Sequence, residues 1–142
     1  MPNAQRTVVI NKPIADVFAF VADGEEAPQW RTGVLEIKKT SGNGPDATYK
    51  QVVQGPGGRK VDADYQITEY QPPNHLAFKA IAGPVRPIGS YDLAETDGKT
   101  SLTFKLSAEL GGWKKWVMGG QVQKTMDAEM AALDRLKAVL ES

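Results

Sequence analysis

The sequence lacks cysteine altogether and contains a single histidine among its 142 residues. Without cysteine there is no disulfide, no thiolate nucleophile and no cysteine-ligated metal, and one histidine cannot build a histidine-rich metal site. An excess of charge of either sign is also missing, because 17 basic and 17 acidic residues give a formal net charge of +0. A nucleic-acid partner is therefore not expected, since such proteins carry a basic surface. We expect no metal and no cofactor.

Long apolar runs are absent as well. No stretch reaches the roughly 20 apolar residues that a transmembrane helix needs, and the start of the chain lacks the apolar core of a signal peptide. We therefore expect no membrane span and a cytoplasmic location. By its length, the chain 1–142 is predicted to form a single domain with one core.

The last stretch, Gln121–Glu141, contains neither glycine nor proline and follows the pair Gly119-Gly120. Its apolar side chains recur in steps of three or four residues, which places them on one side of a helix. They are Val122, Met126, Met130, Leu133, Leu136 and Leu140. The pattern predicts a helix of about 30 Å that begins after the glycine pair. Because its other side is polar, we expect the apolar stripe to cover a sheet.

The beginning of the chain predicts one strand followed by two short helices. Gln5–Ile10 is rich in residues that favour strands. Asn11 is a candidate helix cap, and Pro13 suits the first helical turn. We expect this helix to end at Asp23-Gly24, which leaves room for only a turn or two of helix before Trp30.

After Gly33, apolar and polar residues alternate, and clusters of Gly, Pro and Asn interrupt the alternation. Period-two alternation predicts strands, and the interruptions have the chemistry of hairpin turns. The predicted strands are Val34–Lys39, Thr48–Gln54, Lys60–Tyr70, His75–Ala82, Ile88–Glu95 and Thr100–Leu110. Short turns make consecutive strands antiparallel neighbours, so we expect a meander with one apolar face. The residues expected on that face include Tyr49, Gln51, Tyr65, Ile67, Leu76, Phe78, Tyr91, Leu93, Leu102, Phe104 and Leu106.

This order of elements is similar to a known family. The residues that carry the likeness are Pro13, Val17, Phe18, Asp23 and Trp30 after the first strand, Gly98, Thr100 and Leu102 at the last hairpin, and Leu136-Lys137 with Leu140-Glu141 at the end. Almost the whole chain resembles the START-like, or helix-grip, superfamily, and within it the polyketide cyclase/dehydrase-like group. The resemblance implies an α+β fold in which a curved seven-stranded antiparallel sheet wraps around a long C-terminal helix, with an apolar cavity between them.

We assign no catalytic residue from the sequence. His75 starts a strand after a turn, where a side chain usually faces solvent. Asp62 and Asp64 share the face that we expect to be exposed, because burying unpaired carboxylates is costly. Glu36 and Glu69 lie at strand ends, where the alternation does not assign them to either face of the sheet.

The ligand-binding residues that we expect are four polar groups that fix orientation and five side chains that form apolar walls. The polar groups are Tyr49, Gln51, Tyr65 and Tyr91; the walls are Phe78, Phe104, Trp116, Met126 and Met130. Trp113 and Trp116 lie between two glycine pairs. They are expected either to form a hinged gate at the cavity or to close the core, and the sequence favours neither.

Members of the resembled family bind lipids, sterols, polyketides, quinones or plant hormones, and only some are enzymes. The resemblance therefore implies a small hydrophobic or amphipathic ligand of lipid, polyketide or aromatic type as the partner. A polyketide cyclase or dehydratase acting in the same cavity is one alternative, and a chaperone cofactor or other protein-interaction module is another. A homodimer is compatible with each of these hypotheses.

Overall fold

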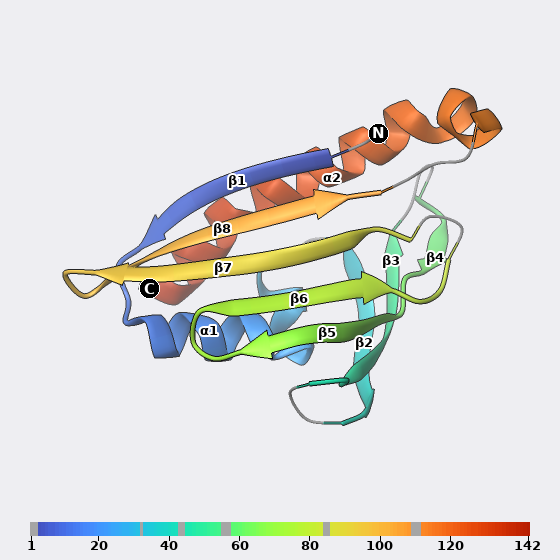
Figure 1. Cartoon of the computed structure of the whole chain (residues 1–142). Coiled ribbons are helices and arrows are strands. Elements are labelled where there is room, and N and C mark those ends of the chain that lie inside the picture. The colour runs from blue at the N-terminus through green and yellow to red at the C-terminus, as the bar shows by residue number, and fades with distance from the viewer. Residues whose placement is uncertain (1–2, 32, 43–44, 55–57, 84–85, 109–111) are drawn as a thin grey trace.

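A computed structural model of the chain describes residues 3–31, 33–42, 45–54, 58–83, 86–108 and 112–142, and for 112–122 it describes the backbone alone. The elements form one curved sheet with the helices packed against it (Figure 1). The strands are β1 (Asn3–Ile10), β2 (Val34–Ser41), β3 (Thr48–Gln54), β4 (Lys60–Asp62), β5 (Tyr65–Gln71), β6 (His75–Ala80), β7 (Ile88–Thr96) and β8 (Lys99–Ser107). The helices are α1 (Ile14–Ala22), the 3-10 helix η1 (Gly24–Gln29) and α2 (Gly112–Glu141).

The sheet is antiparallel, with strand order β1-β8-β7-β6-β5-β3-β2 and with β4 beside β3. This is the predicted α+β helix-grip fold, except that the described residues form eight strands where seven were expected. The extra strand arises because the predicted strand Lys60–Tyr70 is interrupted at Ala63 and Asp64. Both halves pair with β3 in one continuous register, and the Asp64 carboxylate accepts the backbone N–H of Gln51 at 3.1 Å.

Helix α2 begins at Gly112, so the predicted break at Gly119-Gly120 is wrong. A glycine inside a helix costs about 1 kcal/mol relative to alanine. That cost weakens a helix of 30 residues without ending it. The side chains of Trp113 and Trp116 lie outside the described residues. Within the described ranges, no helix is both long enough and apolar enough to cross a membrane.

The start of α1 also differs from the prediction. Asn11 does not cap it; the helix begins at Ile14, with Pro13 at the cap position and no capping side chain from that residue. The Ile14 N–H instead donates to the Glu95 carboxylate on β7 at 3.0 Å. The N–H of Asn11 donates to the carboxylate of Glu141, at the end of α2. The first N–H of α1 is therefore satisfied by a residue from a distant part of the chain, and so is the N–H of Asn11 before the helix.

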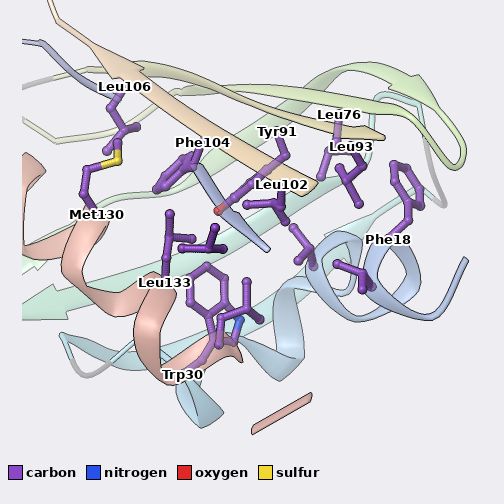
Figure 2. Packing of buried hydrophobic residues seen from close by; sticks show 14 of the residues in the cluster. Phe18, Trp30, Leu76, Tyr91, Leu93, Leu102, Phe104, Leu106, Met130 and Leu133 are labelled. Carbon is purple, nitrogen blue, oxygen red and sulfur yellow. The ribbon is translucent and has the colours of Figure 1, made fainter. Parts of the chain in front are cut away.

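The core lies between the inner face of the sheet and the helices (Figure 2). Leu102, Phe104 and Leu106 of β8 are buried, as their alternation predicts. Leu133 and Leu136 of α2 are 0% exposed, which confirms the orientation expected for the apolar stripe. Figure 2 shows Met130 and Leu133 turned from α2 toward these β8 residues.

Polar contacts hold α2 along β1, the outer strand of the sheet on that side (Figure 1). Arg6 of β1 donates to both carboxylate oxygens of Asp134, at 2.5 and 3.1 Å, and this contact lowers the pKa of Asp134. Lys137 donates to the carbonyl of Val9 at 2.7 Å. These contacts cover a strand edge that would otherwise be open to pairing with another chain.

Candidate functional site

A cavity of about 390 Å³ lies among the inner face of the sheet, the α1–η1 segment and α2. Its walls are mainly apolar and include Val21, Ala27, Trp30, Phe78, Phe104, Leu106 and Met126. Gly89 on β7 makes room for the Phe78 ring, because it lies in register between Phe78 and Leu106. A methyl group at Gly89 would lie 2.7 Å from one ring carbon of Phe78. The Phe78 ring occupies the place that a side chain at Gly89 would take.

Aromatic rings in mutual contact lie along one side of the cavity, and Tyr65, Phe78, Tyr91 and Phe104 among them line it. Tyr49 stacks on Tyr65 with centroids 4.9 Å apart, and Tyr65 meets Phe78 edge to face at 5.7 Å. Phe104 stacks on Tyr91 at 4.4 Å and lies 6.4 Å from Phe78. Such contacts fix ring orientation. The surface offered to a ligand is therefore flat, apolar and held in place.

An ion pair projects into this apolar space. Arg31, next to Trp30 at the end of η1, donates to Glu129 of α2 through Nε at 2.8 Å and through Nη2 at 3.1 Å. The two side chains are only 16% and 20% exposed. Burial alone lowers the pKa of Arg31, but the carboxylate of Glu129 raises it, and the net shift is upward. Arg31 is therefore charged at any physiological pH.

Gln51 completes this polar group from β3. Its side-chain oxygen accepts from Nη1 of Arg31 at 2.9 Å, and its amide nitrogen donates to the carbonyl of Ala63 at 3.1 Å. Gln51 is 5% exposed, so these bonds replace the water that it loses on folding. Gln51 lines the cavity, and both ends of its amide are hydrogen-bonded within the protein, so that it helps to orient Arg31.

Tyr65 and Tyr91 place hydroxyl groups in the same region. Burial raises the pKa of both phenols, while the charge of Arg31 acts in the opposite direction. Both phenols are therefore neutral near pH 7. Among the described residues, neither hydroxyl has a hydrogen-bond partner. The Tyr65 hydroxyl packs against Gly24, which has no side chain to block it.

Six of the nine predicted ligand-binding residues line the cavity: Gln51, Tyr65, Phe78, Tyr91, Phe104 and Met126. Tyr49 does not, because it packs against Tyr65 and donates its hydroxyl to the carbonyl of Ala22 at 3.5 Å. Met130 does not line the cavity either; it is buried in the core. The Trp116 side chain lies outside the described residues.

The sequence prediction missed Arg31 and Glu129. A signal for Glu129 was present, because it lies three residues after Met126 and one before Met130, next to the apolar stripe of α2. A charge at that position borders the covered side of the helix. No comparable signal marks Arg31. Its contact with Glu129 spans 98 residues of sequence.

The other titratable candidates lie away from the cavity or at its rim. His75 is held on β6 by Asp92 at 2.6 Å and by Glu69 at 2.8 Å, and these hydrogen bonds raise its pKa. It is half-buried rather than fully exposed, and it does not line the cavity. Asp62 is exposed at the cavity rim, as expected of its face, whereas Asp64 is half-buried, contrary to the prediction.

Solved structures share this fold at low sequence identity. A protein from Thermus thermophilus matches with a TM-score of 0.82 and 19% identity, covering 98% of this chain and 97% of that one. A START superfamily protein from Mycobacterium smegmatis matches with a TM-score of 0.72 and 16% identity, over 98% and 97% of the two chains. The aromatase/cyclase Zhui from Streptomyces sp. R1128 matches with a TM-score of 0.73 and 13% identity, over 98% and 93%.

Among curated proteins, none matches the sequence. The family model described as "Polyketide cyclase / dehydrase and lipid transport" matches residues 1–141. The match covers nearly the whole chain and agrees with the helix-grip fold and with the structural neighbours. The protein therefore belongs to the polyketide cyclase/dehydrase and lipid transport family.

Proposed function

We propose that the protein binds a small amphipathic ligand in the cavity, with the polar end of the ligand at Arg31 and its apolar body against the aromatic wall. The observation that carries this proposal is a charged side chain with unused donors inside an apolar space. An arginine has five N–H donors. Within the part of the chain that the structure describes, Glu129 occupies two of the Arg31 donors and Gln51 occupies one, which leaves two.

The size and chemistry of the cavity support the proposal. Ligand pockets of about 300–1,000 Å³ are typical, with mainly apolar walls and a few placed polar groups. The cavity of about 390 Å³ falls in that range. Three of its polar side chains, those of Arg31, Glu129 and Gln51, meet at one place on the wall. The family description, which names both polyketide chemistry and lipid transport, agrees with an amphipathic ligand.

The first test is to identify what the protein carries. Native mass spectrometry and organic extraction of protein purified from its own host should reveal a bound compound of a few hundred daltons at most, as the cavity size requires. The matched control is the double variant Arg31→Met/Glu129→Met, which removes both charges while keeping similar side-chain volume. Replacing a buried ion pair by apolar residues is often neutral for stability, so this variant should fold.

We expect the double variant to lose the compound that the wild type carries. Retention of the same compound at the same occupancy would contradict the role of Arg31. If the wild type carries nothing and also fails to take up any amphipathic aromatic probe, ligand binding itself is refuted.

A second candidate function is an enzyme of the polyketide cyclase type, and the position of Glu129 favours it. A carboxylate inside the cavity can accept a proton from a substrate, and the adjacent guanidinium can stabilise the negative charge that then develops on a carbonyl oxygen. Incubation with a poly-β-ketone substrate separates the two functions. A carrier returns the substrate at the uncatalysed rate, whereas an enzyme accelerates cyclisation and loses this acceleration in Glu129→Gln but not in His75→Gln.

A further inference from the structure

We infer that the polar end of the ligand is an uncharged oxygen acceptor, such as a ketone, quinone or ester carbonyl, and not a carboxylate or phosphate. The inference rests on the proposed function and narrows it to a chemical class. It depends on two properties of the site: the sum of its charges, and the kind of hydrogen-bonding group that it leaves unused.

The charges of the inner site cancel. Glu129 neutralises Arg31 through two hydrogen bonds to the same carboxylate. Tyr65 and Tyr91 are neutral, because burial raises the pKa of each phenol. Among the described lining residues, the remaining charge is that of Asp62 at the rim, and it is negative. An anionic ligand would leave water without gaining a counter-charge, and this is costly in an apolar cavity.

The unused groups are hydrogen-bond donors. Arg31 has two N–H groups without a partner among the described residues, and the hydroxyls of Tyr65 and Tyr91 can also donate. Both oxygens of Glu129 already accept from Arg31. A carbonyl oxygen can accept two hydrogen bonds and brings no charge, so it satisfies these donors without disturbing the ion pair. A carboxylate would compete with Glu129 for the guanidinium and would be repelled by it.

The test compares two probes of nearly equal shape, 2-acetonaphthone and 2-naphthoate, by isothermal titration calorimetry at pH 7.5. The carboxylate oxygen of the second replaces the methyl group of the first, and simple carboxyl groups are ionised at this pH. For the wild type we expect the ketone to bind at least about tenfold more tightly than the carboxylate, a ratio that corresponds to about 1.4 kcal/mol.

The variant Glu129→Gln gives the inner site a net positive charge while changing little in shape. We expect this variant to lower the ratio of ketone affinity to carboxylate affinity by about tenfold or more. Glu36→Gln is the matched control, because it makes the same chemical change on an exposed residue of β2 away from the cavity, and it should leave the ratio unchanged.

Each outcome decides one of the two proposals. If the wild type binds the carboxylate as tightly as the ketone or more tightly, the inference is overturned while ligand binding stands. If the wild type binds neither probe, the proposed function fails and the inference fails with it. If Glu129→Gln does not fold, the ratio of ketone affinity to carboxylate affinity in the wild type still tests the inference. The double variant Arg31→Met/Glu129→Met should then bind both probes without a preference for the ketone.

Discussion

The ion pair between Arg31 and Glu129 makes a prediction about stability that is independent of any ligand. Replacing Glu129 by glutamine removes the negative charge but keeps one oxygen that can accept. At least one charge-assisted hydrogen bond is lost, which is worth about 1.5–3 kcal/mol, and the guanidinium is left without its counter-charge. Breaking a fully buried pair costs about 3–5 kcal/mol. Here up to a fifth of each side chain reaches solvent, so we expect a loss of about 2–3 kcal/mol, since solvent screens part of the interaction.

A double-mutant cycle separates the pair from the two side chains. Arg31→Met and Glu129→Met should each be destabilising, because each leaves one charge without its partner. The double variant should be close to the wild type in free energy of unfolding. Urea denaturation followed by the fluorescence of the tryptophans, of which Trp30 is 2% exposed, measures all four proteins. If each single variant costs about 2–3 kcal/mol and the double variant costs almost nothing, the interaction energy is about 4–6 kcal/mol. This exceeds the roughly 0.5–3 kcal/mol usual for residues in contact, because each single variant leaves a largely buried charge without its partner.

Additive effects of the two single variants on the free energy of unfolding would contradict a stabilising ion pair. An interaction energy below about 0.5 kcal/mol is what distant, independent sites show, and it would mean that the pair does not form in solution. The exposed pair Arg6–Asp134 provides the comparison within the same protein. Its two side chains are 37% and 68% exposed, so the same cycle at that pair should give a much smaller interaction energy.

Three other predictions concern packing and pH. Leu136→Ala should cost about 2–5 kcal/mol in denaturant melts, and Met126→Ala should cost clearly less because part of that side chain already faces the cavity; equal losses would argue against an open space. Gly24→Ala should destabilise by about 1–3 kcal/mol through overpacking against Tyr65, whereas Gly33→Ala, with nothing within 4 Å of the added carbon, should have little effect. For His75, whose pKa is raised in the folded state, the protonated form is stabilised. Its contribution should be complete below the unfolded pKa of about 6.5 and lost as pH rises through the folded pKa; parallel pH–stability curves for the wild type and His75→Gln would contradict this.

Most of the fold could be predicted from periodicity. The alternation of apolar and polar residues determines which face of β8 is buried, because a one-residue shift in register would expose Leu102, Phe104 and Leu106 together. The apolar stripe identified α2 for the same kind of reason. The places where prediction failed are those where local chemistry was overruled by distant contacts. Asn11 looked like a cap, but the N-terminus of α1 is satisfied by Glu95 from another element.

The candidate site was less predictable than the fold, for a physical reason. Apolar wall residues such as Phe78 and Phe104 follow from the face of the strand on which they lie. Arg31 follows from no repeating pattern, because it stands at the end of a short 3-10 helix, and only the tertiary structure brings it to Glu129. A polar group that is buried must find its partner within the fold. The partner can lie anywhere in the chain, which periodicity does not report.

Helix α2 divides into two parts with different tasks. Toward its C-terminal end, Leu133 and Leu136 are completely buried and close the core. One to two turns earlier, Met126 and Glu129 face the cavity. Substitutions in the first group remove packed volume and so act on stability. Substitutions at Met126 and Glu129 instead change the shape and charge of the cavity, which is already open. Stability on the one hand, and the shape and charge of the cavity on the other, can therefore vary separately along one helix.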